Sequence, residues 1–169
     1  GVPTTFLYLS FYWDNLIHFG MGPKREADGT LAFSLPIGDA ALPGIAAQDI
    51  GACALALFAQ GAAVIGQHVG IAGEHLTLAQ MAHSLGRALG EPVQARAMAP
   101  ADYARMAFAG ADELANMFQF KRDFSDAFRA RRPVVETRCL NPAALNFDAW
   151  LLRHAHALAT PPRAAAHGG

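Results

Sequence analysis

The chain has 169 residues, of which 53% are hydrophobic and 16% are charged, and its formal net charge is -1. This length and composition suit one domain with a hydrophobic core and exclude a disordered segment. The balanced charge gives no overall attraction to nucleic acid or to an anionic membrane. Two cysteines without CxxC spacing are typical of a reducing, cytoplasmic location, and the apolar run at 50–58 is too short to span a bilayer.

The first predicted element lies within residues 4–15, TTFLYLSFYWDN. Its first half is apolar without alternation, which is typical of a strand buried on both faces of a parallel sheet. Ligands bind outside the carboxyl ends of such strands, so residues 10–15 are the expected ligand-facing edge. Tyr12 and Asn15 are three apart, and on a helical turn they would share a face that could hold a planar heterocycle. The alternative is that these side chains only fill the core.

Further elements follow in chain order. We predict a short helix over 16–22, a polar loop over 24–29 and strands over 31–35 and 44–47. Asp49 is the expected N-cap of a helix over 50–59, which is apolar all round and should therefore be buried.

The second half of the chain is expected to be mostly helical. A strand is predicted over 67–72, and a capping box of Thr77 and Gln80 opens a helix that ends at Gly90. An edge strand over 92–97, a short helix from Pro100 to Met106, a long helix over 111–130 and a final helix around Trp150 follow. Residues 159–169 are expected to be a loose tail.

The chain shows no complete active site. It has no Gly-x-Ser-x-Gly elbow, no Tyr-x-x-x-Lys pair and no phosphate-binding glycine loop, so no catalytic residue is predicted. Its seven histidines have no ligand spacing, and no metal site is predicted. Arg129, Arg131 and Arg132 could hold a phosphate, although a solvated charged face is the simpler interpretation.

Several segments carry a family resemblance. The stretches 4–15, 34–39 (SLPIGD), 48–51 (QDIG), 100–103 (PADY), 110–118 (GADELANMF) and 140–142 (LNP) resemble the NmrA-like branch of the atypical short-chain dehydrogenase/reductases, most of all its NADP(H)-sensing, HSCARG-like group. Two positions depart from the family pattern. The family often has arginine where Tyr8 stands, and HSCARG-like members have proline at Ser10.

The resemblance implies an α/β fold: the C-terminal part of a Rossmann-type parallel sheet with a smaller, mostly helical subdomain. The glycine-rich dinucleotide-binding half is expected to lie before Gly1. Residues 1–11 and 44–75 would be sheet-core elements, 12–43 and 76–130 the cleft-forming subdomain, and 131–158 a C-terminal segment. Tyr12, Trp13, Asp14 and Asn15 would be the cofactor-binding residues.

The implied function is an NADP(H)-binding regulatory or redox-sensor protein, with the cofactor bound only by the full-length protein. Its partners would be the dinucleotide and a protein that contacts the helical subdomain, without nucleic acid or membrane. The alternative is an NAD(P)H-dependent reductase of a small carbonyl or quinone-like substrate, so whether the chain is an enzyme stays open.

Overall fold

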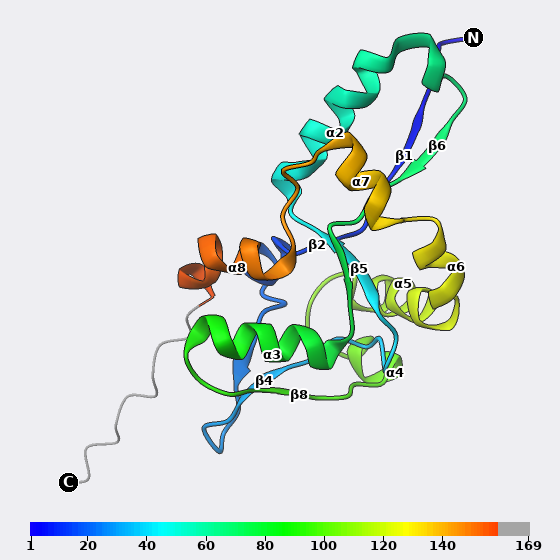
Figure 1. Ribbon diagram of the computed structural model, residues 1–169. Coiled ribbons are helices and arrows are strands. Elements are labelled where there is room, and N and C mark those ends of the chain that lie inside the picture. The colour runs from blue at the N-terminus through cyan, green and yellow to red at the C-terminus, as the bar shows by residue number, and fades with distance from the viewer. Residues whose placement is uncertain (159–169) are drawn as a thin grey trace, which may run out of the picture.

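Three short β-sheets organise the chain, which a computed structural model describes over residues 1–158 (Figure 1). β1 (Phe6–Tyr8) pairs in parallel with β6 (His68–Gly70). β2 (Phe11–Tyr12) pairs in parallel with β5 (Leu42–Ile45), which pairs antiparallel with β7 (Glu74–Leu76). The parallel pairing predicted for residues 4–15 is therefore confirmed, but the expected single strand is divided into β1 and β2 in two sheets. The fold is mixed α/β.

The third sheet lies at the other end of the molecule from β1 and β6 (Figure 1). It has the strand order β3–β4–β8, formed by β3 (Lys24–Arg25), β4 (Leu31–Phe33) and β8 (Val93–Ala95). β8 is an edge strand, as the sequence predicts.

Helices pack around the sheets. α2 (Ala47–Gln60) runs along β1 and β6 and contacts α7 (Val134–Leu140), while α3 (Leu78–Leu89) packs on β8 and α8 (Phe147–His154) (Figure 1). The remaining helical elements are α1 (Asn15–His18), the 3-10 turn η1 (Gly61–Val64), α3 (Leu78–Leu89), α4 (Pro100–Tyr103), α5 (Ala111–Asp123), α6 (Ser125–Ala130), α7 (Val134–Leu140), α8 (Phe147–His154) and the 3-10 turn η2 (Ala155–Ala157). The tail predicted over 159–169 lies outside the described residues.

Two apolar clusters form the core. The larger one centres on Trp13, Phe147 and Trp150, with Trp13 and Phe147 ring centroids 5.3 Å apart. The smaller cluster consists of Ile45, Cys53 and Ile71, and it lies between α2 and the strand ends. Successive residues of a strand point to opposite faces, so β2 contributes side chains to both clusters.

The helix predicted over 50–59 exists, but two expectations about it were wrong. It begins at Ala47 with Ala46 as the N-cap, and the buried carboxylate of Asp49 instead accepts the backbone N–H of Leu145 at 2.8 Å. The helix is also not buried all round, because Leu55 is 70% exposed and Phe58 is 82% exposed. One face packs on the smaller cluster, and no element among residues 1–158 covers the other.

Other helix and strand boundaries differ from the predicted ones for local reasons. The long helix predicted over 111–130 divides at Phe124, whose φ of -113° is not helical, into α5 and α6. The predicted polar loop over 24–29 begins with β3, and its Asp28-Gly29 turn is present with Gly29 at φ +90°. The sequence reading missed β7 and α7.

Candidate functional site

The four predicted cofactor-binding residues do not share one surface. Tyr12 lies in β2 and packs against the smaller cluster, whereas Trp13 lies in the larger cluster and is 1% exposed. The helix starts only at Asn15, so the helical face expected to join Tyr12 and Asn15 does not form. The strand geometry separates neighbouring side chains instead.

Two of these four residues have structural partners. The indole of Trp13 packs beside Gly44, and a Cβ on Gly44 would collide with its Nε1 atom. The Asp14 carboxylate accepts the backbone N–H of Ala47 at 2.8 Å, which places a negative charge at the N-terminus of α2. Asn15 is half-buried, and its carboxamide has no hydrogen bond within residues 1–158. Tyr12 and Asn15 therefore remain the untested candidates of the set.

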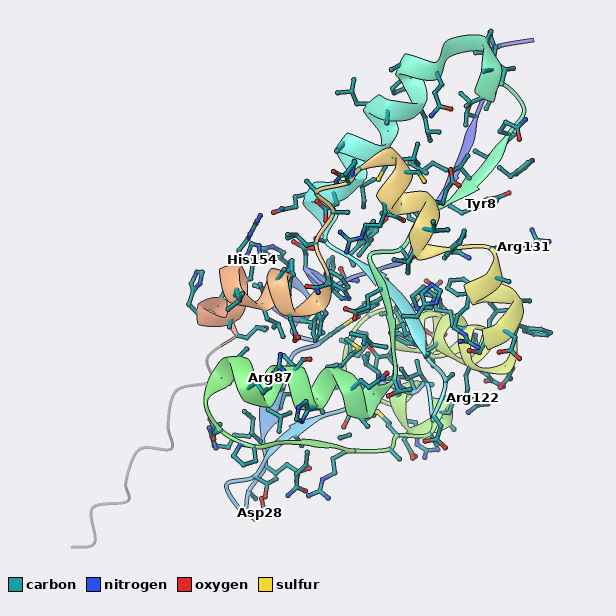
Figure 2. The ribbon with its side chains drawn as sticks, in the orientation of Figure 1. Tyr8, Asp28, Arg87, Arg122, Arg131 and His154 are labelled. Carbon is teal, nitrogen blue, oxygen red and sulfur yellow. The ribbon has the colours of Figure 1, made fainter. Side chains whose placement is uncertain are left out.

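A second group of side chains meets at the carboxyl end of β1. A cavity of about 360 Å³, here called the aromatic groove, is lined by Tyr8, Phe120, Phe124, Ala127, Phe128, Arg131 and Arg132. Tyr8 comes from the strand, while the other residues come from α5, α6 and the turn after α6. Tyr8 and Arg131 lie beside each other in Figure 2. The groove thus occupies the edge where α/β sheets bind ligands.

Arg132 fixes the wall of the groove to the strand end. Its Nε donates to the Leu9 carbonyl at 2.8 Å, and its guanidinium carbon lies 3.7 Å from the ring centroid of Phe128. A guanidinium on a ring face at this distance is a favourable cation–π contact. Arg132 is therefore held in place, whereas Arg131 makes no ion pair among the described residues and is free to meet an anion.

Lys121 packs against Phe128, one of the groove rings, but does not itself line the groove. Its ammonium nitrogen is 3.4 Å from the sulfur of Met117 and 5.5 Å and 5.7 Å from the ring centroids of Phe118 and Phe128. Burial among these apolar groups, with a smaller contribution from the charge of Arg132, lowers the pKa of Lys121 to about 8. An amine with this pKa gives and takes protons near neutral pH.

Tyr8 is held by a neighbour on the paired strand. Its hydroxyl lies 2.6 Å from Nδ1 of His68, and the two rings stack with centroids 5.5 Å apart. The His68 ring also stacks on Phe6 at 4.5 Å. Gly70 lets the end of β6 lie against the turn after α6, because a Cβ at this position would collide with the carbonyl of Arg131.

Sequence reasoning did not identify the groove as a site. Phe120, Phe124 and Phe128 recur at helical spacing in the sequence, and such a stripe is more often core packing than a ligand site. In the structure Phe120 and Phe124 are 53% and 57% exposed. The available signals were the strand-end position of Tyr8 and the possible phosphate-binding cluster that contains Arg131 and Arg132, and neither indicates that α6 folds back to the strand.

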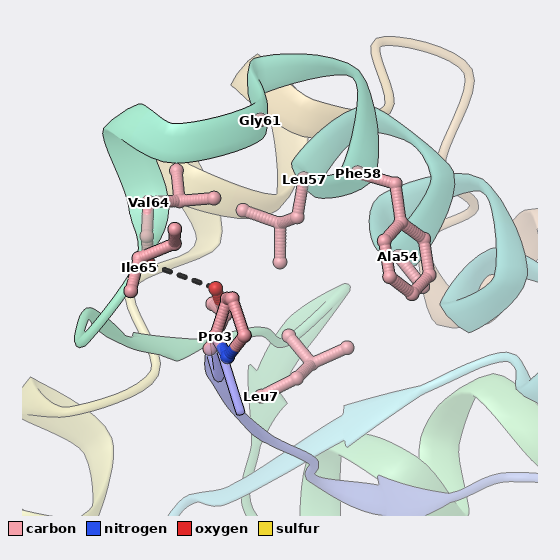
Figure 3. A pocket seen from close by; sticks show the side chains of 9 residues that line it. Pro3, Leu7, Ala54, Leu57, Phe58, Gly61, Val64 and Ile65 are labelled. Atoms are coloured by element: carbon pink, nitrogen blue, oxygen red, sulfur yellow. Dashed lines mark hydrogen bonds between the residues drawn. The ribbon is translucent and has the colours of Figure 1, made fainter. Parts of the chain in front are cut away.

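The exposed face of α2 forms a second apolar surface. A cavity of about 320 Å³ lies between this helix and the N-terminal segment, with Pro3, Leu7, Leu57, Phe58 and Ile65 among its lining residues (Figure 3). Within residues 1–158, β1 pairs with β6 alone, so its other edge is open. An open strand edge beside exposed apolar side chains is a surface on which another strand can add.

Among residues 1–158, no three histidine, cysteine or acidic side chains gather as a metal site would require. The helical run Ala47–Val64 has 18 residues and is long and apolar enough to cross a membrane, which the sequence stretch 50–58 alone did not indicate. A single helix of this kind is weak evidence for a membrane span, but only 17% of this stretch is buried, unlike the core helices of soluble proteins that pass the same test.

Comparison with known proteins places these features in a family context. Residues 1–150 match the NmrA-like family. The solved structure of NmrA, a negative transcriptional regulator in complex with NAD, is similar with a TM-score of 0.71 and 21% identity over 90% of this chain and 52% of NmrA.

Two oxidoreductases are also similar in fold. Citrobacter sp. triphenylmethane reductase complexed with NADP(H) has a TM-score of 0.69 and 14% identity, over 91% of this chain and 53% of that protein. An Escherichia coli NADPH-dependent quinone oxidoreductase complexed with NADPH has a TM-score of 0.64 and 20% identity, over 88% of this chain and 51% of that protein. The chain thus spans about half the length of these structures.

Proposed function

The chain belongs to the NmrA-like family, and we propose that it is the cleft-closing part of an NADP(H)-binding regulatory protein of the HSCARG-like kind, whose cofactor occupancy reports redox state. The observation that carries the proposal is the aromatic groove at the carboxyl end of β1. Its exposed rings suit a flat heterocycle, and Arg131 suits a phosphate. Asn15 and Tyr12, at the end of β2, are proposed as further cofactor contacts.

The proposed protein contains a glycine-rich half that the present sequence lacks. We assign its docking position to the open edge of β1 and the apolar face of α2, where a parallel strand would gain backbone hydrogen bonds and cover Phe58. Residues 1–11 and 44–75 then complete one sheet, and 12–43 and 76–130 close over the ligand. Apolar contacts with a protein half also account for the composition of α2 without a membrane.

A redox sensor requires different affinities for two conformations rather than chemistry on a substrate. The helices α5 and α6 supply such an element, because Phe120 and Phe124 of the groove stay more than half exposed in the described structure. Dinucleotide in the cleft would bring these rings into contact with the sheet half. In this account the same helices present the partner-binding surface, and the protein is cytoplasmic.

The competing function is an NAD(P)H-dependent reductase of a small carbonyl or quinone-like compound. Lys121 favours it, since a pKa of about 8 suits a proton donor and its ammonium nitrogen lies 5.7 Å from the centroid of the groove ring Phe128. Steady NADPH consumption with a quinone or aldehyde, abolished by Lys121→Met, would identify the reductase. Tight NADPH binding without turnover would identify the sensor.

The direct test compares two forms of the protein. NADPH is titrated into the 169-residue chain and into the product of its native reading frame, including whatever that frame encodes before Gly1. We expect micromolar binding by the native-frame protein and binding weaker by about a hundredfold in the 169-residue chain, which has no pyrophosphate loop. A native-frame protein that fails to bind millimolar NADPH or NADH would overturn the proposed function.

A further inference from the structure

A separate cavity lies between the β3–β4 strands and the segment from Met98 to Leu114, away from the aromatic groove. Its volume is about 690 Å³, and we call it the methionine cavity after Met21, Met98 and Met106 in its wall. Phe19, Tyr103 and Phe108 supply aromatic rings, and Leu114 on α5 closes one side. No residue lines both this cavity and the aromatic groove. The two are distinct sites.

The size and wall chemistry suit a small organic molecule. Ligand pockets in proteins commonly measure roughly 300 to 1,000 Å³ and are mainly apolar with a few polar groups. Methionine side chains adapt to irregular ligands, and their sulfur atoms make favourable contacts with aromatic rings. The ring of Tyr103 is braced edge-on by Phe108 and Phe118, at 5.7 Å and 5.6 Å between centroids, so the aromatic part of the wall is preformed.

Three polar groups of the lining have no partner within residues 1–158. These are the hydroxyls of Ser34 and Tyr103 and the ammonium of Lys24. The acidic residue of the lining, Glu26, is paired instead with Arg96 at 3.2 Å. The unpaired groups can therefore donate hydrogen bonds, and Lys24 supplies one positive charge. This combination is complementary to an anion.

We propose that the methionine cavity binds a flat aromatic carboxylic acid, with its rings among the methionines and its carboxylate at Lys24 and the two hydroxyls. The site lies wholly within residues 19–114, so it does not depend on the dinucleotide function or on a glycine-rich half. The binding measurement below can fail or succeed independently of NADPH binding.

The experiment uses the 169-residue chain with methyl-labelled methionine and naphthoate as the probe. Of the five methionines, Met21, Met98 and Met106 line the cavity, while Met81 and Met117 do not and serve as internal controls. Single Met→Leu variants assign the signals. We expect naphthoate to shift the three lining methyl signals saturably and to leave the signals of Met81 and Met117 unshifted.

Variants then separate the contribution of the Lys24 charge to binding from the contribution of the apolar cavity volume. Lys24→Gln should weaken naphthoate binding about threefold at low salt and leave the neutral analogue naphthalenemethanol unchanged, as expected for one partly exposed ion pair. Ala107→Trp, an exposed lining position, should fill the cavity and weaken both probes at least about tenfold. The matched control Ala59→Trp, on exposed α2, should bind like wild type.

Three outcomes would overturn the inference. The first is the absence of shifts at the lining methionines at millimolar naphthoate. The second is equal binding by wild type and Ala107→Trp. The third is loss of binding in Phe58→Ser, which would assign the probe to the apolar face of α2.

Discussion

Lys121 and Arg132 both face the ring of Phe128, with the ammonium nitrogen 5.7 Å and the guanidinium carbon 3.7 Å from its centroid. Two cations on one ring repel each other, and of the two the lysine can lose its proton near neutral pH. The charge beside Phe128 of the aromatic groove is therefore expected to change between pH 7 and pH 9, whereas Arg132 stays charged.

This relationship predicts a pH-dependent stability. The pKa of Lys121 is about 8 in the folded chain and about 10.4 for an unperturbed lysine, so the unfolded state binds more protons in that window. Stability should therefore rise with pH from about 8 to about 10. Urea unfolding should show Lys121→Met to be more stable than wild type at pH 7 by about 1 kcal/mol, with the gap closing at high pH.

The same pKa can be measured directly. The chain has two lysines, Lys24 and Lys121, so carbon-13-labelled lysine gives two signals and Lys24→Arg leaves only the signal of Lys121. We expect that signal to titrate near pH 8. A midpoint near 10.4 would mean that the ammonium is solvated and that Lys121 has no role as a proton donor.

Gly44 gives a packing prediction. A Cβ at this position would collide with the indole of Trp13, so Gly44→Ala should destabilise the chain by about 1–3 kcal/mol in urea unfolding. Gly51 on α2 has open space around its Cβ position, so the matched change Gly51→Ala should be neutral or stabilising by about 0.5–1 kcal/mol. Equal effects of the two changes would contradict the close packing of Gly44 on Trp13.

The Asp49 carboxylate gives a second stability prediction. It is buried and accepts the Leu145 N–H at 2.8 Å, which anchors the segment before α8 to α2. Asp49→Ala leaves that donor unpaired and should cost about 2–3 kcal/mol. Asp49→Asn keeps an acceptor oxygen and should cost less. If Asp49 were only a helix cap, the two variants would instead shift the helix signal in circular dichroism without affecting α8.

The exposed face of α2 predicts self-association of the isolated chain. Leu55, Phe58 and Phe6 present apolar side chains beside an open strand edge. Sedimentation should show concentration-dependent dimers or larger species, and Leu55→Lys combined with Phe58→Lys should shift the chain to monomer. A wild-type chain that stays monomeric at high concentration would show that this face needs no partner.

The sequence predicted the elements whose signals are local. Thr77 and Gln80 form the expected capping box, and Gly90 ends α3 with a left-handed φ of +75°. The parallel pairing of residues 4–15 also followed from composition alone, because a continuous apolar run suits strands between two layers. Its expected burial on both faces was wrong for β1, because Phe6 is 45% exposed and Leu7 and Tyr8 are only half-buried.

The errors arose where tertiary contacts override local preference. Asp49 has the residue type of an N-cap, but its carboxylate binds a backbone group 96 positions later in the chain. α7 carries the β-branched pair Val134-Val135 after Pro133, which favours strand over helix by propensity. The groove could not be predicted, because it depends on the break at Phe124 that turns α6 toward Tyr8.

The central claim is that the dinucleotide meets the aromatic groove. Its most direct test is NADPH titration of the native-frame protein carrying Phe124→Ala or Arg131→Gln, two exposed changes with little cost in stability. Each should weaken NADPH binding about three- to tenfold, while Lys24→Gln in the methionine cavity should leave it unchanged. Wild-type affinity in both groove variants would contradict the claim and move the cofactor to other residues.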